Sequence, residues 1–377
     1  MSSRAALLGM QTHSQALPGT SGCASAYISD RKDRRVRVSI ARVAVLTNKM
    51  THAQKCGSIT FAIVAILAAA LLTGCSPRSS AEGTFDKTFE VNGPVHLELA
   101  SGSGDAHITT GPPGEVRVHG EVQVKTWSEQ SSQRRVHDIE SNPPVSQEGN
   151  LVRVSGSGQH THDVSIDYSI VVPPDTEIHA TTGSGDLEVN GIKGPATFTS
   201  GSGAISASNI AGDVQAVAGS GAIELSNIQG QVQVTAGSGD ITLNAVHGET
   251  RLHTGSGDLE IADPGDALEA STGSGDVTIK GASADIRLRT SSGDVTVDGN
   301  PGNSNYWDIH TSSGDVILQV PPTANFRLYA RSSSGDIDAG IPIVMEGTTS
   351  KHELRARIGA GKGRVEVQSS SGSISLK

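Results

Sequence analysis

The chain repeats one glycine-rich motif, GSGD or a close variant, at a nearly fixed interval through its second half. The serine of the motif lies at residues 184, 202, 220, 238, 256, 274 and 292, always 18 residues apart, and then at 313 and 334, which are 21 residues apart. A repeat of this length is one small structural unit that must stack on its neighbours to bury a core. The repeat therefore restricts the fold more than any other feature of the sequence.

Apolar and polar residues alternate after each motif, which is typical of a short strand with one buried face. Counted from the first glycine, the fifth position holds Leu187, Ile205, Ile223, Ile241, Leu259, Val277 and Val295, and the seventh holds Val189, Ala207, Leu225, Leu243, Ile261, Ile279 and Val297. A second alternation later in the unit includes Val232 with Val234 and Ile286 with Leu288. Between the two strands lies a second corner that ends in glycine at 194, 212, 230 and 248.

These patterns predict an all-β protein, a single-stranded parallel β-solenoid (β-helix) with coils of roughly 18 residues. A strand of four or five residues buries its apolar face only when identical strands stack on it, about 4.8 Å apart. We expect glycine at the GSG corner because it reaches backbone angles that other residues avoid, and because the next coil lies directly on top. We expect the aspartate to accept hydrogen bonds from backbone N–H groups of the tight turn.

The segments around the repeats predict a less regular β structure. Residues 84–180 are expected as an N-terminal β region with strands over 84–126 and 150–172, and residues 181–377 as the solenoid with its C-terminal cap. Residues 127–141 predict a short helix with Trp127, Val136 and Ile139 as its apolar contacts. The tail, 364–376, is interpreted as final strands or a cap, because open ends of a solenoid pair with other chains.

The N-terminal part of the chain contains an export signal. Residues 59–72 form a run of 14 apolar or nearly apolar residues, short for a membrane span and suited to a signal peptide. Leu72-Thr73-Gly74-Cys75 resembles the bacterial lipobox, which implies that Cys75 carries a diacylglycerol and anchors the protein in a membrane. We therefore expect residues 50–74 to be a lipoprotein signal peptide starting at Met50, and 75–83 a lipidated tether. Residues 1–49 are expected to be non-translated or a disordered extension.

Charge and cysteine content exclude several functions. The residues after Cys75 include 20 basic and 37 acidic side chains, a net charge of −17, which argues against nucleic acid as a partner. The three cysteines, Cys23, Cys56 and Cys75, all lie in the first 75 residues. Disulfides, thiol catalysis and cysteine-bound metals are thus excluded in the rest of the chain.

Several motifs together resemble a bacterial family of unknown function that is labelled "putative adhesin". They are the VPP step at 172–174, the recurrent GSGD or SSGD, and IGAGKGRVEVQSSSGSI at 358–374. The resemblance covers nearly all of the chain after the signal. It implies a surface role without a defined ligand or catalytic residue.

The repeated aspartates are the main candidate site. Asp240, Asp258, Asp276 and Asp294 occupy one position of four successive repeats, while Ala204 and Ala222 replace the aspartate in the two repeats before. The structural interpretation is that they cap turns, with no cofactor. The alternative is a calcium-binding β-roll-like adhesin, because stacked carboxylates about 5 Å apart repel each other unless cations lie between them.

Other chemistry is less well supported by the sequence. A polysaccharide-acting β-helix enzyme would need outer carboxylates such as Glu188, Glu224 and Glu260, which are more typical of a solvated face. His160, His162 and Asp163 could bind a metal but fit an exposed polar loop better. A phosphate loop and an ice-binding threonine ladder do not fit the pattern. We therefore expect a non-catalytic binding, adhesion or scaffolding protein with a protein or glycan ligand. We expect it in the bacterial cell envelope, lipid-anchored at the outer membrane or the cell surface.

Overall fold

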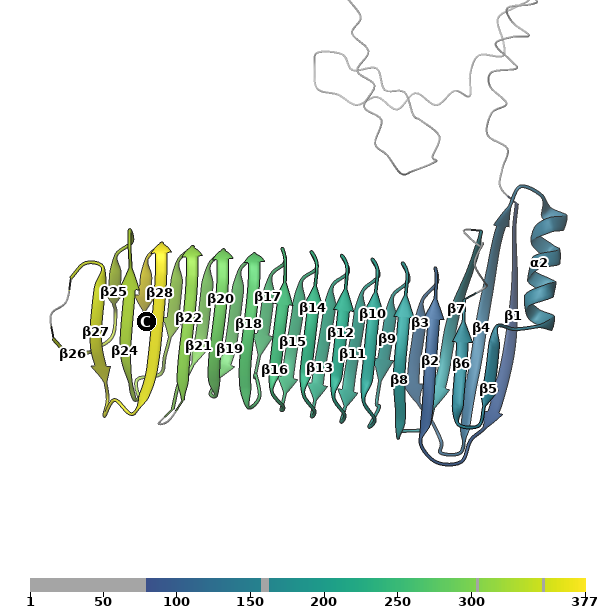
Figure 1. The fold of residues 1–377 in the computed structure, drawn as a ribbon, viewed down its shortest axis with the longest axis horizontal. Coiled ribbons are helices and arrows are strands. Elements are labelled where there is room, and N and C mark those ends of the chain that lie inside the picture. Colours follow the sequence, from purple (N-terminus) through teal and green to yellow (C-terminus); the bar gives the residue numbers. More distant parts are fainter. Residues whose placement is uncertain (1–78, 157–162, 303–304, 348–349) are drawn as a thin grey trace, which may run out of the picture. The chain divides into compact units, whose positions relative to one another are not determined.

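The computed structural model describes residues 79–156, 163–302, 305–347 and 350–377. All described elements belong to one compact unit, Arg78–Lys377. Two sheets face each other along this unit, and their strands run across its long axis (Figure 1). Side chains that point between the sheets form one continuous apolar core.

The first sheet has 14 strands. In spatial order they are β1 (Ser79–Glu90), β4 (Glu115–Thr126), β7 (Val164–Val172), β3 (Ala106–Thr110), β9 (Leu187–Asn190), β11 (Ile205–Ile210), β13 (Ile223–Ile228), β15 (Ile241–Val246), β17 (Leu259–Ala262), β19 (Val277–Ala282), β21 (Val295–Gly299), β23 (Val316–Gln319), β29 (Ile374–Leu376) and β25 (Ile337–Ala339).

The second sheet has 15 strands. In spatial order they are β26 (Val344–Met345), β27 (Glu353–Ile358), β24 (Phe326–Ser332), β28 (Gly363–Ser371), β22 (Tyr306–Ser313), β20 (Asp285–Ser292), β18 (Ala267–Ser274), β16 (Thr250–Thr254), β14 (Val232–Ala236), β12 (Val214–Ala218), β10 (Ala196–Ser200), β8 (Thr176–Thr182), β2 (Val95–Ser101), β6 (Leu151–Ser155) and β5 (Val145–Glu148).

The parallel β-solenoid predicted from the 18-residue repeat is confirmed. Each coil contributes one strand to each sheet, and successive coils pair in parallel with a shift of one repeat. The seven residues of the first predicted apolar column pair in sequence from Leu187 to Val295, and all of them are buried. Every coil therefore places its apolar side chains on those of the coil before, which is what keeps the core continuous.

The coils at the two ends of the unit do not follow the order of the chain. At one end, β2 lies between β6 and β8. At the other end, β28 lies between β22 and β24. The tail 364–376, expected as final strands or a cap, forms the last two strands of the chain, β28 and β29, but β28 lies one coil inside the end of the unit. The end itself is covered by β27 and β26, which pair in antiparallel fashion beyond β24.

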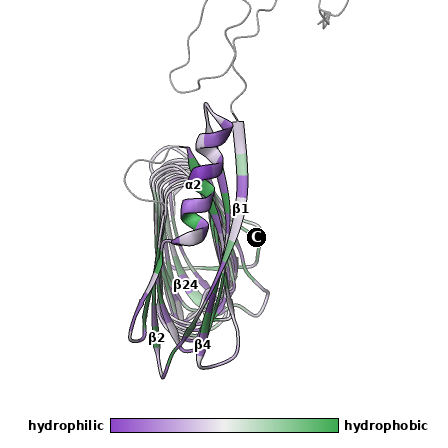
Figure 2. Ribbon diagram, turned by 90° about the vertical axis from the view of Figure 1, so that its right-hand side faces the viewer, coloured by the Kyte–Doolittle hydropathy of each residue, from purple (hydrophilic) through white to green (hydrophobic). Residues whose placement is uncertain are grey.

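The predicted helix is α2 (Glu129–Ser141), which packs on β1 and β4 (Figure 2). Val136 is buried, Ile139 is partly buried, and the Ser132 hydroxyl donates to the Ser79 carbonyl at 3.1 Å. Gly83 leaves room for the helix, because a Cβ atom there would overlap Val136. Trp127 was expected among the apolar contacts, but its side chain is exposed, because it precedes the helix and does not lie on its packed face.

Close stacking, and not an unusual backbone angle, explains the glycines of the GSG corner. Within the corners from residue 183 to residue 275, no glycine has a positive φ. A Cβ atom at Gly203, Gly221 or Gly239 would overlap the carbonyl group of the corresponding glycine one coil earlier. The expectation of special backbone angles is therefore wrong for these corners, whereas the expected close approach of the next coil is present.

The left-handed conformation occurs instead at the second corner of each coil. Asn209, Asn227, Ala245 and Asp263 have φ between 51° and 57°. Asparagine and aspartate tolerate this conformation better than most residues. The Asn227 amide also donates to the Asn209 side chain at 2.7 Å, so the asparagines form a short ladder along the coils.

Stacking of the glycine corners predicts a contrast between two equivalent positions. Gly183 and Gly102 occupy the same place in the motif, but a Cβ atom would overlap the Gly102 carbonyl in the first case and meet nothing within 4 Å in the second. Gly183→Ala should lower the free energy of unfolding by about 1–3 kcal/mol through overpacking. Gly102→Ala should be neutral or slightly stabilising. Denaturant titration measures both, and equal effects would contradict the stacking explanation.

Candidate binding surface

The predicted aspartates form a ladder along one edge of the solenoid. The backbone N–H groups of Asp258, Asp276 and Asp294 each donate to the Oδ1 atom of the aspartate one coil earlier, at 2.8–2.9 Å. The ladder continues as Asp315 donates to Asp294 and Ser373 to Asp315. Each carboxylate thus binds the backbone of the next coil and not that of its own turn.

The same arrangement holds the first coils together. Backbone N–H groups of Asp105, Asp186 and Ala204 donate to the carboxylates of Asp167, Asp105 and Asp186 respectively, at 2.8–2.9 Å. Asp186 thus accepts a hydrogen bond from the next coil, in which Ala204 replaces the aspartate. An aspartate ladder interrupted in this way is an aid to stacking and not a strict requirement of the fold.

The carboxylates of the corner aspartates take part in the backbone ladder. One oxygen of each carboxylate accepts from a backbone donor, and the side chains are exposed. Within residues 79–156, 163–302, 305–347 and 350–377, no group of three or more His, Cys, Asp or Glu side chains is placed to hold a metal ion.

Other residues singled out in the sequence have different positions. Cys75, His160 and His162 lie outside the described residues. Glu188 and Glu260 lie on the outer face of the 14-stranded sheet in exposed ion pairs with His107, at 3.0 Å, and with Lys280, at 2.9 Å. In the part of the chain that is described, no helix is long and apolar enough to cross a membrane.

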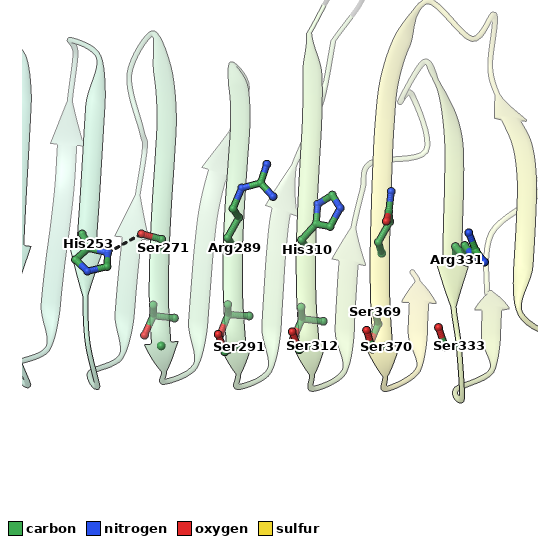
Figure 3. A pocket seen from close by; sticks show the side chains of 15 residues that line it. His253, Ser271, Arg289, Ser291, His310, Ser312, Arg331, Ser333, Ser369 and Ser370 are labelled. Atoms are coloured by element: carbon green, nitrogen blue, oxygen red, sulfur yellow. Dashed lines mark hydrogen bonds between the residues drawn. The ribbon is translucent and has the colours of Figure 1, made fainter.

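A groove of about 670 Å³ lies on the outer face of the 15-stranded sheet, towards its C-terminal end (Figure 3). Its centre is one row of outward side chains that successive strands place side by side. In spatial order the row consists of His253, Ser271, Arg289, His310, Gln368 and Arg331. A second row, exposed at the ends of the strands, consists of Ser291, Ser312, Ser370 and Ser333.

The groove differs in charge from the rest of the protein. The residues that line it include two arginines, two histidines, six serines and three threonines, and no aspartate or glutamate. All eight arginines between residues 251 and 364 lie in strands of this one sheet. Six of these arginines pair with neighbouring carboxylates, and the lining of the groove itself combines arginine and histidine with hydroxyl groups.

Two acidic residues beside the groove, Asp308 and Glu366, form hydrogen bonds and ion pairs with neighbouring side chains. Asp308 is buried, accepts a hydrogen bond from Arg289 at 3.4 Å, and its Oδ1 atom lies 3.0 Å from Nδ1 of His310. Glu366 accepts a hydrogen bond from the Tyr306 hydroxyl at 2.7 Å and pairs with Arg364. The bond from Tyr306, with help from Arg364, lowers the pKa of Glu366, while burial and the same bond raise the pKa of Tyr306 to about 12.

Two arginines of this face have no such partner. Within the described residues, neither Arg287 nor Arg331 forms an ion pair, and both are exposed.

Sequence reasoning missed this surface, because His310 and Gln368 are 58 residues apart and become neighbours only through the inserted strand β28. The available signal was the clustering of arginines after residue 250 at alternate positions of predicted strands.

Comparisons with known proteins give one family match and several solved structures. A family model described as Toastrack DUF4097 matches residues 96–377. Crystal structures of a "putative adhesin" from Bacteroides fragilis and a "putative cell adhesion protein" from Clostridium sporogenes are similar, with 14% and 13% identity and TM-scores of 0.34 and 0.21. The matches cover 78% and 79% of this chain and 97% and 99% of those chains. No curated protein matches the chain.

The ladder geometry predicts how the corner aspartates respond to substitution. Asp258→Ala removes the acceptor for the Asp276 N–H group. It should lower the free energy of unfolding by about 0.5–2 kcal/mol, by analogy with other side-chain caps. Asp258→Asn should cost less, because an amide oxygen can still accept the bond. Urea denaturation of the two variants measures the difference.

Thermal denaturation with added calcium distinguishes capping from calcium binding. If the aspartates only cap, millimolar calcium should raise the melting temperature no more than sodium chloride of equal ionic strength. A calcium-specific rise that disappears when Asp240, Asp258, Asp276 and Asp294 are all changed to Asn would contradict the capping role.

Proposed function

The chain belongs to the Toastrack family, DUF4097, and on this basis we propose that it is a non-catalytic binding protein that mediates adhesion at the bacterial cell envelope. The observation that carries the proposal is the groove on an otherwise regular sheet face, lined by arginine, histidine and hydroxyl side chains from six adjacent strands. A row of polar side chains on a rigid sheet is suited to recognising an extended ligand, because the backbone ladder fixes the spacing of its contacts.

Anchoring through Cys75 would present this groove away from the membrane. Three residues separate Cys75 from Ser79, where β1 begins, so the lipid would hold the end of the unit formed by β1. The groove is lined by strands such as β22, β28 and β24, which lie towards the opposite end (Figure 1). From β6 to β28 the sheet advances by ten strands, about 48 Å at about 4.8 Å per strand. A lipid-anchored protein with its binding surface far from the anchor is what adhesion at a cell surface requires.

The two alternative functions, a calcium-dependent adhesin and a polysaccharide-cleaving enzyme, would require different sites on this structure. A calcium-dependent adhesin would use the aspartate edge, which the groove does not include. A polysaccharide-cleaving enzyme would need a pair of carboxylates at the bound sugar, whereas the groove is lined by none. Incubation of residues 76–377 with envelope and plant oligosaccharides, followed by analysis for shortened products, tests the enzyme. Turnover would contradict the proposal.

Lipidation is tested by removing the thiol. Cys75→Ser should move the protein from the membrane fraction to the soluble fraction and abolish labelling by a fatty-acid probe, because the diacylglycerol has no other thiol after the signal to which it can attach. Fractionation and probe labelling of cells measure both effects. Labelling that persists in the variant would exclude Cys75 as the anchor.

Adhesion is tested with the soluble chain. Residues 76–377 contain every described strand of both sheets, so this part carries the complete fold. It should bind a subset of a glycan and protein array without altering the bound molecules. Absence of any binding would contradict a binding function.

A further inference from the structure

We propose that the groove is a binding site for an acidic polysaccharide whose negative groups are carboxylates, such as a chain of uronic acids. The inference rests on the proposed binding function and adds the chemical class of the ligand and the residues that recognise it. It is carried by the composition of the groove, its extent across the strands and the charge of the side chains that line it.

Charge complementarity indicates an anionic ligand. Arg289 and Arg331 lie in the groove, and no carboxylate lines it. Arg287 lies on the adjacent outward row, between Glu269 and Asp308. Arg331 and Arg287 form no ion pair within the described residues, so their guanidinium groups can bind a ligand without losing an existing partner. Arginine binds carboxylates in a planar, often bidentate, geometry.

Hydroxyl and amide groups indicate that the rest of the ligand is polar. Ser291, Ser312, Ser370 and Ser333 form one exposed row, and Gln368 lies between His310 and Arg331. Where earlier coils begin the corner with glycine, as at Gly255 and Gly273, these coils begin it with serine. The change from glycine to serine adds a hydroxyl group in each coil, so the groove offers hydrogen bonds at the spacing of the strands.

The same lining argues against other macromolecules. No Phe, Tyr, Trp, Leu, Ile, Val or Met side chain lines the groove, so it lacks the apolar anchors of a protein interface and the large aromatic stacking platforms of a single-stranded nucleic-acid site. The net charge of −17 also repels a densely charged nucleic acid. A sugar polymer with spaced carboxylates fits a groove in which two arginines are separated by histidine and glutamine along one row.

Polygalacturonate is the probe for the test, with its fully methyl-esterified form as a control that has the same sugar chain without charge. We expect residues 76–377 to bind polygalacturonate, measured by calorimetry, with an affinity that falls as salt increases. Arg289→Gln with Arg331→Gln should weaken binding about tenfold. Arg153→Gln with Lys280→Gln changes the net charge equally, at exposed ion-paired positions outside the groove, and should change the affinity less than twofold.

Three outcomes would overturn the inference. Equal weakening by both double variants would mean that only net charge matters. Equal binding of the methyl ester would mean that the carboxylates are not recognised, and equal binding of single-stranded DNA would mean non-specific polyanion binding. Binding to other array ligands without binding to polygalacturonate would reject this inference and leave the binding function intact, whereas absence of all binding would reject both.

Discussion

The structure depends on one constraint, the exact superposition of each coil on the coil before it. Parallel strands bond to their neighbours through backbone groups only, and the corners must approach as closely as the strands do. At the second glycine of the corner, as at Gly203 and Gly221, this leaves no room for a Cβ atom, because a carbonyl group of the preceding coil already occupies its place. The repeat of glycine at fixed intervals is therefore a consequence of the strand spacing and not of a ligand.

The aspartate and asparagine ladders follow from the same constraint. A corner has backbone N–H groups that the strand ladder does not satisfy, and a side chain from the coil before can reach them. Asp258 bonds to the backbone of Asp276, and at another edge Asp213 bonds to the backbone of Gln231. Such ladders fix the register at corners, where a slip by one residue would turn the apolar side chains outwards.

Much of this fold could be predicted from the sequence, because an 18-residue period with two apolar alternations has few other solutions. The buried columns, the parallel pairing and α2 all follow from local patterns. The exchanged order of strands at the ends could not be predicted, because β28 and β24 have similar patterns and either could pair with β22. The expected positive φ is present at the corner glycines Gly104, Gly293 and Gly314, whereas between residues 201 and 275 it occurs at Asn209 and Asn227 and the corner glycines are explained by close stacking. The groove depends on that exchanged order, so it too was hidden from sequence reasoning.

The position of β28 is the part of the account that a single measurement tests most directly. The chain has no cysteine after Cys75, so a disulfide between two introduced cysteines reports the contact between those two positions. His310 pairs with Gln368, and Gln368 with Arg331, whereas His310 and Arg331 are separated by β28. Oxidation of His310→Cys with Gln368→Cys should form a disulfide detectable by mass spectrometry, and His310→Cys with Arg331→Cys should not, because bridged Cα atoms lie within about 7 Å. The opposite result would show that the coils stack in chain order, and the groove built across them would not exist.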